Sequence, residues 1–153
     1  MRILMVCLGN ICRSPLAEGI LRHKTTQKGL DWEVDSAGTS GYHEGEHPDS
    51  RSIAVARSYG IDITAQRSRM ITLQDLEDFD WILVMDSSNY NNVKKLCRSA
   101  EQLHKIKLIM NYVNPDYNTP VPDPYWEDDG FDQVYRMLDV ACDALVAKHT
   151  QEL

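Results

Sequence analysis

The 153-residue sequence has few cysteines, no long apolar run and no excess of basic residues. Four cysteines are too few for a disulfide scaffold, which indicates a reducing compartment. The apolar run at residues 3–7 is too short for the hydrophobic region of a signal peptide or for a membrane span. We therefore expect a cytoplasmic protein that does not bind membranes.

The charge balance is acidic, with 16 Lys and Arg residues against 23 Asp and Glu residues and a formal net charge of -7. This balance argues against nucleic acid as the main partner. It does not exclude a small anionic ligand, because a local pocket of backbone N–H groups and arginines can attract an anion against the global field. Length and composition are those of an ordinary globular protein, so we expect a single domain over residues 1–153.

Apolar runs alternate with segments of helical periodicity along the whole chain. Strands are predicted at residues 2–7, 32–37, 81–85 and 106–110. Helices are predicted from Ser14 and Pro15 onward, and at residues 49–59, 72–79, 88–98 and 131–145. Ser14 is the expected N-cap of the first helix, and Thr72 with Asp75 forms a capping box. This alternation predicts an α/β fold with a parallel sheet.

One long irregular stretch, residues 111–130, contains four of the six prolines. Loops of this length in a compact domain are usually functional or disordered. Ligands of open parallel sheets bind at the carboxyl ends of the strands, so this stretch and the loop after the first strand are expected to meet there.

The segment CLGNICRS, residues 7–14, has the composition of a phosphate-binding loop between a buried strand and a helix N-terminus. The backbone N–H groups of residues 8–13 (Leu8, Gly9, Asn10, Ile11, Cys12 and Arg13) are expected to surround one tetrahedral oxyanion. Gly9 and Asn10 suit the positive φ angles of such a loop. Arg13 would bind two phosphate oxygens with its planar guanidinium. The nucleotide-binding pattern GxxxxGK[ST] is absent from the sequence.

Cys7 is the candidate nucleophile of this loop. The helix N-terminus and Arg13 favour a thiolate near neutral pH, and the thiolate would lie directly beneath the phosphorus. A small buried cysteine at the end of a strand is the structural alternative, but its position between a strand and a Ser-Pro helix start favours the functional interpretation.

Asp123 is the candidate proton donor for the leaving group. It lies between two prolines in VPDPYW, residues 121–126, and a stiff loop can hold a carboxylic acid at a fixed distance from the leaving oxygen. An ordinary Asp-Pro turn explains the same residues equally well. The residues alone leave both interpretations open.

Four motifs in this order resemble the low-molecular-weight protein tyrosine phosphatases: CLGNICRSP, VDSAGTSGY, VMDSSN and VPDPYW. The resemblance covers essentially the whole chain. It implies a three-layer α/β fold, in which a four-stranded parallel sheet of strand order 2-1-3-4 carries helices on both faces and the phosphate loop follows strand 1. It also implies hydrolysis of phosphotyrosine monoesters without a cofactor or metal, through a cysteinyl phosphate.

The resemblance assigns a role to each matching residue. Cys7 is implied as nucleophile, Arg13 as phosphate ligand and Asp123 as general acid. Ser14 would donate a hydrogen bond to the thiolate, and Ser36 would brace Asn10. The rim of a deep slot for phenyl phosphates would comprise Ile11, Tyr42, Tyr125 and Trp126.

Two positions, Cys12 and Gln66, add detail to this resemblance. Cys12 matches a family cysteine that can form a reversible disulfide with the nucleophile, and we expect the same here. Gln66 stands where many members have a histidine that braces the loop asparagine, and a glutamine cannot be cationic. Cys97 and Cys142 are expected to be structural.

Three alternatives remain. An arsenate reductase of the same fold needs two further cysteines near the third strand, where residues 81–96 contain none. A protein-arginine phosphatase resembles this chain but has a smaller polar residue at the position of Ile11. A silent anion-binding module would need neither Cys7 nor Asp123. We therefore expect a phosphotyrosine protein or peptide as substrate, inorganic phosphate as product, and a monomer or weak dimer.

Overall fold

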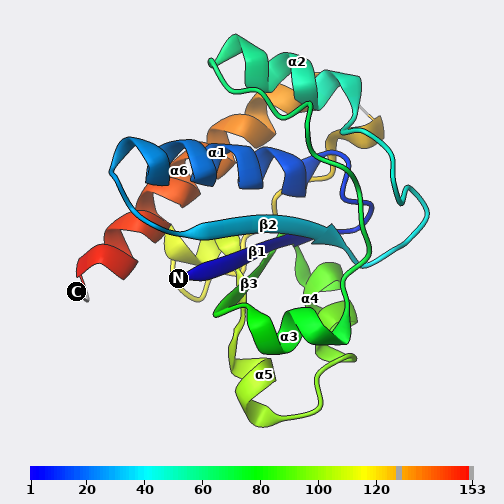
Figure 1. Ribbon diagram of the computed structural model, residues 1–153, viewed down its shortest axis with the longest axis vertical. Helices are drawn as coiled ribbons and strands as arrows, with labels where there is room; N and C mark the ends of the chain where they lie inside the picture. Colours follow the sequence, from blue (N-terminus) through cyan, green and yellow to red (C-terminus); the bar gives the residue numbers. More distant parts are fainter. Residues whose placement is uncertain (127–128, 152–153) are drawn as a thin grey trace.

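We describe the protein from a computed structural model that covers residues 1–126 and 129–151, which build a three-layer α/β structure (Figure 1). In this part of the chain a parallel sheet contains four strands in the order β2-β1-β3-β4. The predicted fold class and strand order are confirmed. The strands are β1 (Arg2–Cys7), β2 (Glu33–Gly38), β3 (Trp81–Val84) and β4 (Ile106–Leu108).

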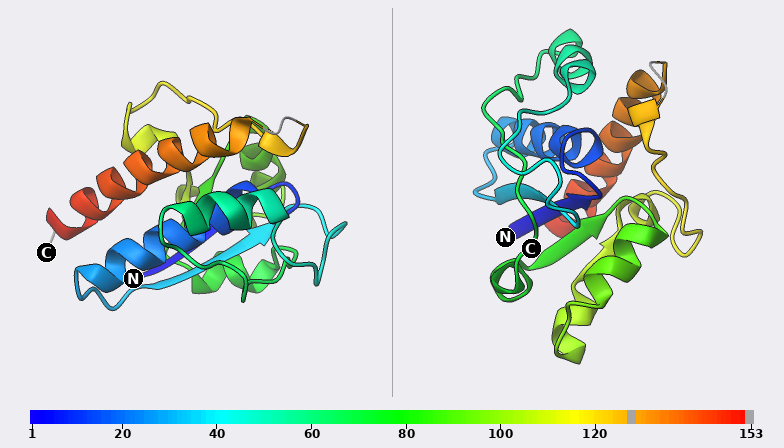
Figure 2. Two further views of the ribbon diagram at one scale, coloured as in Figure 1. Left: turned by 90° about the horizontal axis from the view of Figure 1, so that it is seen from above. Right: turned by 90° about the vertical axis from the view of Figure 1, so that its right-hand side faces the viewer.

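Helices cover both faces of the sheet (Figures 1 and 2). The longest two, α1 (Arg13–Gln27) and α6 (Gly130–Gln151), pack against each other on one face together with α2 (Ser50–Ser58). The other face carries the shorter helices α3 (Leu73–Asp78), α4 (Ser87–Lys94) and α5 (Ala100–His104).

The alternation of side chains along β1 divides the core in two. Ile3, Met5 and Cys7 belong to the cluster beneath α1 and α6, whereas Leu4 and Val6 belong to the cluster beneath α3 and α4. Successive side chains of a strand point to opposite faces, and both faces are covered here. The uninterrupted apolar run of β1 is therefore a consequence of its central position.

The start of α1 differs from the prediction. Ser14 is not the N-cap, because the helix already begins at Arg13 after Cys12, and no side chain caps it. The Ser14 hydroxyl is instead engaged with Cys7 and Asn10. A hydroxyl that bonds these buried side chains is not available to satisfy the free N–H groups at the helix start.

Other boundaries differ by a few residues. The strand β2 begins and ends one residue later than predicted, and β4 stops at Leu108 because the chain turns into the 3-10 helix η1 (Ile109–Tyr112). The sequence analysis missed α5, a five-residue helix too short for an amphipathic pattern. The capping box of Thr72 and Asp75 is confirmed.

The irregular stretch after η1 runs along the carboxyl end of the sheet. Val121 donates a backbone hydrogen bond to the carbonyl of Met85, directly after β3, at 2.8 Å. The 3-10 helix η2 (Pro124–Trp126) follows, and residues 127 and 128 of the predicted stretch lie outside the described residues. None of the helices described is long and apolar enough to cross a bilayer.

Candidate active site

Backbone N–H groups from neighbouring segments bind several carbonyl groups of the loop between β1 and α1. The carbonyls of Cys7 and Leu8 accept from the N–H groups of Thr39 and Ser40 at 3.0 and 2.9 Å, and that of Ile11 accepts from Asp49 at 2.8 Å. Within the described ranges, the N–H groups of residues 9–12 meet no protein acceptor. Free N–H groups on a loop whose carbonyls are tied outward form an anion-binding concavity at the start of α1.

The backbone of this loop requires one left-handed residue. Asn10 has a φ of 55°, as predicted, but Gly9 does not have a positive φ, and that part of the prediction is wrong. Gly9 is instead constrained by space, since a Cβ atom there would lie 3.0 Å from Cδ2 of His43. The glycine permits the imidazole of His43 to pack directly on the loop.

Cys7 lies at the bottom of the concavity and is 3% exposed. Its sulfur is 3.0 Å from the Ser14 hydroxyl and 3.5 Å from the Ser14 backbone nitrogen. Both Ser14 groups can donate to the sulfur, and donors at this position favour a negatively charged thiolate.

Arg13 is held in place before any anion binds. Its side chain is 3% exposed, and one terminal nitrogen donates to Oδ2 of Asp86 at 2.7 Å and to the carbonyl of Val121 at 2.9 Å. The other terminal nitrogen lies 3.8 Å from Oδ2 of Asp123. A buried guanidinium with fixed partners loses little conformational entropy when it binds phosphate oxygens.

Asp123 extends toward Arg13 from the loop before η2. Its carboxylate accepts a hydrogen bond from the backbone N–H of Tyr125 at 3.1 Å, and its side chain is 37% exposed. The flanking prolines restrict φ on both sides of this short turn. The carboxylate is therefore fixed near Arg13 while it remains accessible to solvent and to a leaving group.

These groups line one cavity of about 460 Å³. Aromatic side chains form its rim, and the exposed fractions are 86% for Tyr42 and 85% for Trp126. The rings of Tyr125 and Trp126 pack edge to face, with their centroids 4.9 Å apart. A second cavity of about 490 Å³ lies on the outer side of α1 and shares no residue with the first. The residues lining the first cavity are Cys7, Leu8, Gly9, Ile11, Cys12, Arg13, Ser40, Tyr42, His43, Asp123, Tyr125 and Trp126.

The two cysteines of the loop differ in their chemistry. Burial, together with the negative charges of Asp49, Cys7 and Asp123, raises the pKa of the Cys12 thiol to about 12. Cys12 is therefore protonated at neutral pH and is a poor nucleophile. Neither Cys97 nor Cys142 lines the cavity.

Asn10 is bonded from three directions behind the loop. Its side-chain nitrogen donates to the hydroxyls of Ser14 and Ser36 at 2.7 and 3.0 Å, and its carbonyl oxygen accepts from the backbone of Arg69 at 3.0 Å. Gln66 takes no part in these contacts. Its side-chain nitrogen donates to the carbonyl of Pro15 at 3.0 Å, so the bracing of Asn10 contains no titratable side chain at this position.

The sequence analysis missed several residues that shape the site. Asp86 fixes Arg13, and its place directly after the third strand, inside the quoted motif VMDSSN, was the available signal. Ser68 donates its hydroxyl to the carbonyl of Gly9 at 2.9 Å, and its backbone joins the segment that carries His43. No local pattern marks Ser68, because its partner is 59 residues away.

The arrangement is suited to transfer of a phosphoryl group. A bound tetrahedral anion would contact the free loop N–H groups and Arg13, with the Cys7 sulfur beneath it and the Asp123 carboxyl group beside its outer oxygen.

Comparisons with known proteins agree with this chemistry. Residues 2–153 match the family model described as low molecular weight phosphotyrosine protein phosphatase. The low molecular weight protein-tyrosine-phosphatase YfkJ of Bacillus subtilis is 37% identical over 152 residues, which are 98% of this chain and 96% of that protein.

Solved structures give the same result. A protein tyrosine phosphatase from Entamoeba histolytica, with Hepes in its active site, superimposes with a TM-score of 0.92 at 37% identity and covers 99% of this chain and 98% of its own. A Drosophila arginine phosphatase has a TM-score of 0.91 at 33% identity, and the match covers 97% of this chain and 98% of that chain.

Proposed function

We propose that this chain, which belongs to the low molecular weight phosphotyrosine protein phosphatase family, hydrolyses phosphotyrosine in proteins through a phosphocysteine on Cys7. The proposal rests on one observation above all: a loop of free N–H groups, a buried arginine, a thiol and a carboxyl group converge on one cavity. The family match over residues 2–153 supports one phosphatase domain, and the free cysteines suit a reducing cytoplasm.

The first step forms the covalent intermediate. The Cys7 thiolate attacks phosphorus and the bond to the tyrosyl oxygen breaks, while the carboxylic acid of Asp123 gives its proton to the departing phenoxide. The loop N–H groups and Arg13 stabilise the charge that the equatorial oxygens carry in the transition state. The products of this step are phosphocysteine, a tyrosyl hydroxyl and the Asp123 carboxylate.

The second step regenerates the enzyme. Water enters on the side vacated by tyrosine, and the Asp123 carboxylate accepts a proton from it as its oxygen attacks phosphorus. The sulfur–phosphorus bond breaks, Cys7 returns to the thiolate and inorganic phosphate leaves. The hydrogen bond from Ser14 stabilises the departing thiolate.

The rim of the cavity supports an aromatic substrate. Tyr42, Tyr125 and Trp126 offer apolar ring surface around a buried nucleophile, so the phosphate must be presented on a side chain long enough to reach Cys7. A phenyl ring fills such a slot with favourable stacking, whereas phosphoserine is too short to place its phosphate in the loop.

The two enzymatic alternatives are less well supported. Ile11 lines the cavity and gives it an apolar wall, which suits a phenyl ring better than a phosphorylated guanidinium. An arsenate reductase would need further reactive cysteines near Cys7, but Cys142 is completely buried and burial raises the pKa of Cys97.

The deciding experiment compares turnover of phosphotyrosine, phosphoarginine and phosphoserine peptides of one sequence, with arsenate and thioredoxin in a separate assay. We expect phosphotyrosine to be hydrolysed and Cys7→Ser to be inactive but folded by circular dichroism. Preference for phosphoarginine, reduction of arsenate, or normal turnover by Cys7→Ser would each reject the proposal.

A further inference from the structure

A continuous line of hydrogen bonds runs from the outer side of α1 to the nucleophile. Its members are Glu18, Ser36, Asn10, Ser14 and Cys7, which we call the Glu18 relay. The successive distances are 2.7 Å from Ser36 to Glu18, 3.0 Å from Asn10 to Ser36, 2.7 Å from Asn10 to Ser14 and 3.0 Å from Ser14 to Cys7. The first four members are each at most 4% exposed.

The inner end of the relay has only one arrangement of donors and acceptors. The carbonyl oxygen of Asn10 accepts from the backbone N–H of Arg69, and this contact fixes which side of the amide carries the nitrogen. The nitrogen therefore faces both hydroxyls and donates to each. Ser14 consequently accepts from Asn10, and its single proton remains available for the Cys7 sulfur.

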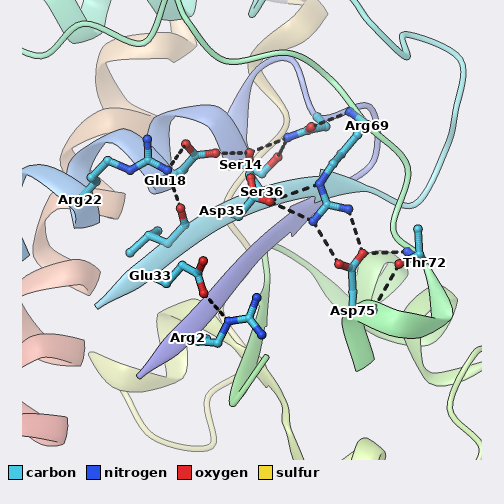
Figure 3. Close-up of polar contacts among 12 residues, drawn as sticks. Arg2, Ser14, Glu18, Arg22, Glu33, Asp35, Ser36, Arg69, Thr72 and Asp75 are labelled. Carbon is cyan, nitrogen blue, oxygen red and sulfur yellow. Dashed lines mark hydrogen bonds and ion pairs between the residues drawn. The ribbon is translucent and has the colours of Figure 1, made fainter. Parts of the chain in front are cut away.

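The outer end is fixed by the Glu18 carboxylate. Figure 3 shows Glu18 between Arg22 and Ser36. One carboxylate oxygen accepts from Ser36 and the other pairs with Arg22 at 3.0 Å. An ionised carboxylate only accepts, so the Ser36 hydroxyl must point at Glu18 and present a lone pair to Asn10.

We propose that Glu18 is a positioning residue for Cys7, because its carboxylate takes the Ser36 proton, leaves Ser36 only a lone pair for Asn10, and so strengthens the one arrangement that keeps the Ser14 proton on the sulfur. The proposal deepens the proposed function and concerns the same nucleophile. Glu18 lines the outer cavity but not the cavity that holds Cys7, and it reaches the sulfur only through Ser36, Asn10 and Ser14.

Charged groups from three segments face Glu18. Arg22 lies one turn further along α1, Asp35 lies on β2, and Arg69 precedes α3 and pairs with Asp35 at 3.1 Å. Burial and Asp35 raise the pKa of Glu18, while the Ser36 hydroxyl, Arg22 and Arg69 lower it, and the net direction is upward. Gln66, the neutral neighbour in the same outer cavity, adds no charge to this set.

The test measures the pH midpoint of Cys7 alkylation by iodoacetamide, read by mass spectrometry of the Cys7 peptide. Charge-assisted hydrogen bonds are about twice as strong as neutral ones, so Glu18→Gln is expected to raise the midpoint by about half a pH unit, about a threefold slower reaction on the acidic side. A purely through-space effect has the opposite sign, because removing a nearby negative charge favours the thiolate.

A double-variant comparison tests the route. Ser14→Ala alone is expected to raise the midpoint by about one unit, and Glu18→Gln should then add nothing, since the last link is gone. Glu33→Gln is the matched control: it removes a carboxylate that pairs with Arg2 at the amino ends of β1 and β2, and its midpoint should equal that of the parent. A lowered or unchanged midpoint in Glu18→Gln, or additive shifts in the double variant, would overturn the proposal.

Folding and function are checked separately. If Glu18→Gln does not fold, Ser36→Ala cuts the relay at its second member with a smaller change and is expected to give the same upward shift; an unchanged midpoint there also overturns the proposal. Alkylation requires no substrate. The Cys7 midpoint can depend on Glu18 even if the parent protein does not hydrolyse phosphotyrosine. That result would refute the proposed function and leave the proposal about Glu18 standing.

Discussion

Replacement of Asp123 by asparagine tests the assignment of the general acid most directly. The variant keeps the size of the side chain and the carbonyl oxygen that accepts from the Tyr125 N–H, so the loop should keep its shape. It removes the ionisable proton. The leaving phenoxide of tyrosine, whose conjugate acid has a pKa of about 10, must then depart without protonation.

The expected loss depends on the leaving group. General acid catalysis contributes about 10²–10⁴-fold, so the rate of the first step for a phosphotyrosine peptide, measured as tyrosine release in a single turnover, should fall by about 10²–10³-fold. Nitrophenyl phosphate releases a much more acidic phenol that needs little protonation. Its single-turnover rate of phenol release should fall by about tenfold or less, because only the proton-transfer part of the first barrier is affected.

The substitution is expected to leave substrate binding almost unchanged. Asp123 lies 3.8 Å from the guanidinium that would hold the phosphate, and its side chain is 37% exposed. The form that donates a proton is the neutral carboxylic acid, and asparagine is neutral as well, so the Kd of the substrate should change by less than about threefold. Single-turnover measurements over a range of substrate concentrations give the rate of the first step and the Kd separately for both substrates.

Asp132→Asn is the matched control for this experiment. Asp132 is a nearby carboxylate on α6 that pairs with Arg136 and accepts from Tyr59, and it does not line the cavity. Its kinetics should match those of the parent for both substrates. Equal losses of the single-turnover rate for both substrates in Asp123→Asn would refute the role of Asp123 as proton donor and indicate that it only positions the loop.

Three further predictions concern other members of the site. Arg13→Lys should lower kcat/KM by about 10²-fold or more, because one ammonium cannot replace a planar donor that binds Asp86, Val121 and phosphate together; a loss below tenfold would contradict this. After peroxide treatment, Cys12→Ser should recover a smaller fraction of its starting activity on addition of thiol than the parent does, and equal recovery would defeat the idea of a protective disulfide. Glu18→Gln should gain thermal stability relative to the parent as the pH rises from about 4 to 7: burial raises the pKa of Glu18 above its ordinary 4.5, so the cost of ionising it is absent below 4.5 and complete above the raised value. If the difference in melting temperature between Glu18→Gln and the parent stays constant across this pH range, that cost does not exist.

The fold was predictable because its signals are local. The buried strand at residues 2–7, the capping box of Thr72 and Asp75 and the apolar face of α6 each depend on residues within a few positions of one another. The boundaries that were wrong depend on distant contacts. Ser14 is not a helix cap because its hydroxyl bonds Cys7 and Asn10, which a propensity argument cannot anticipate.

The predicted site divides in the same way. Cys7 and Arg13 belong to one short loop, whose composition and position between a strand and a helix indicate oxyanion binding. For Asp123, by contrast, the residues left an acid and a simple turn equally open. Its approach to within 3.8 Å of Arg13, across 110 positions of sequence, is a property of the folded chain and favours the acid.

The sequence by itself therefore determined the order of the strands and of the longer helices, the phosphate loop and the family of the chain. Only the tertiary structure decided how that loop is held: Asp86 fixes Arg13, Ser68 fixes Gly9, and Glu18 reaches Cys7 through three other side chains. The physical reason is the direction of hydrogen bonds. Residue spacing predicts which groups a loop contains, but which group donates to which depends on partners that only the folded sheet and helices bring within 3 Å of one another.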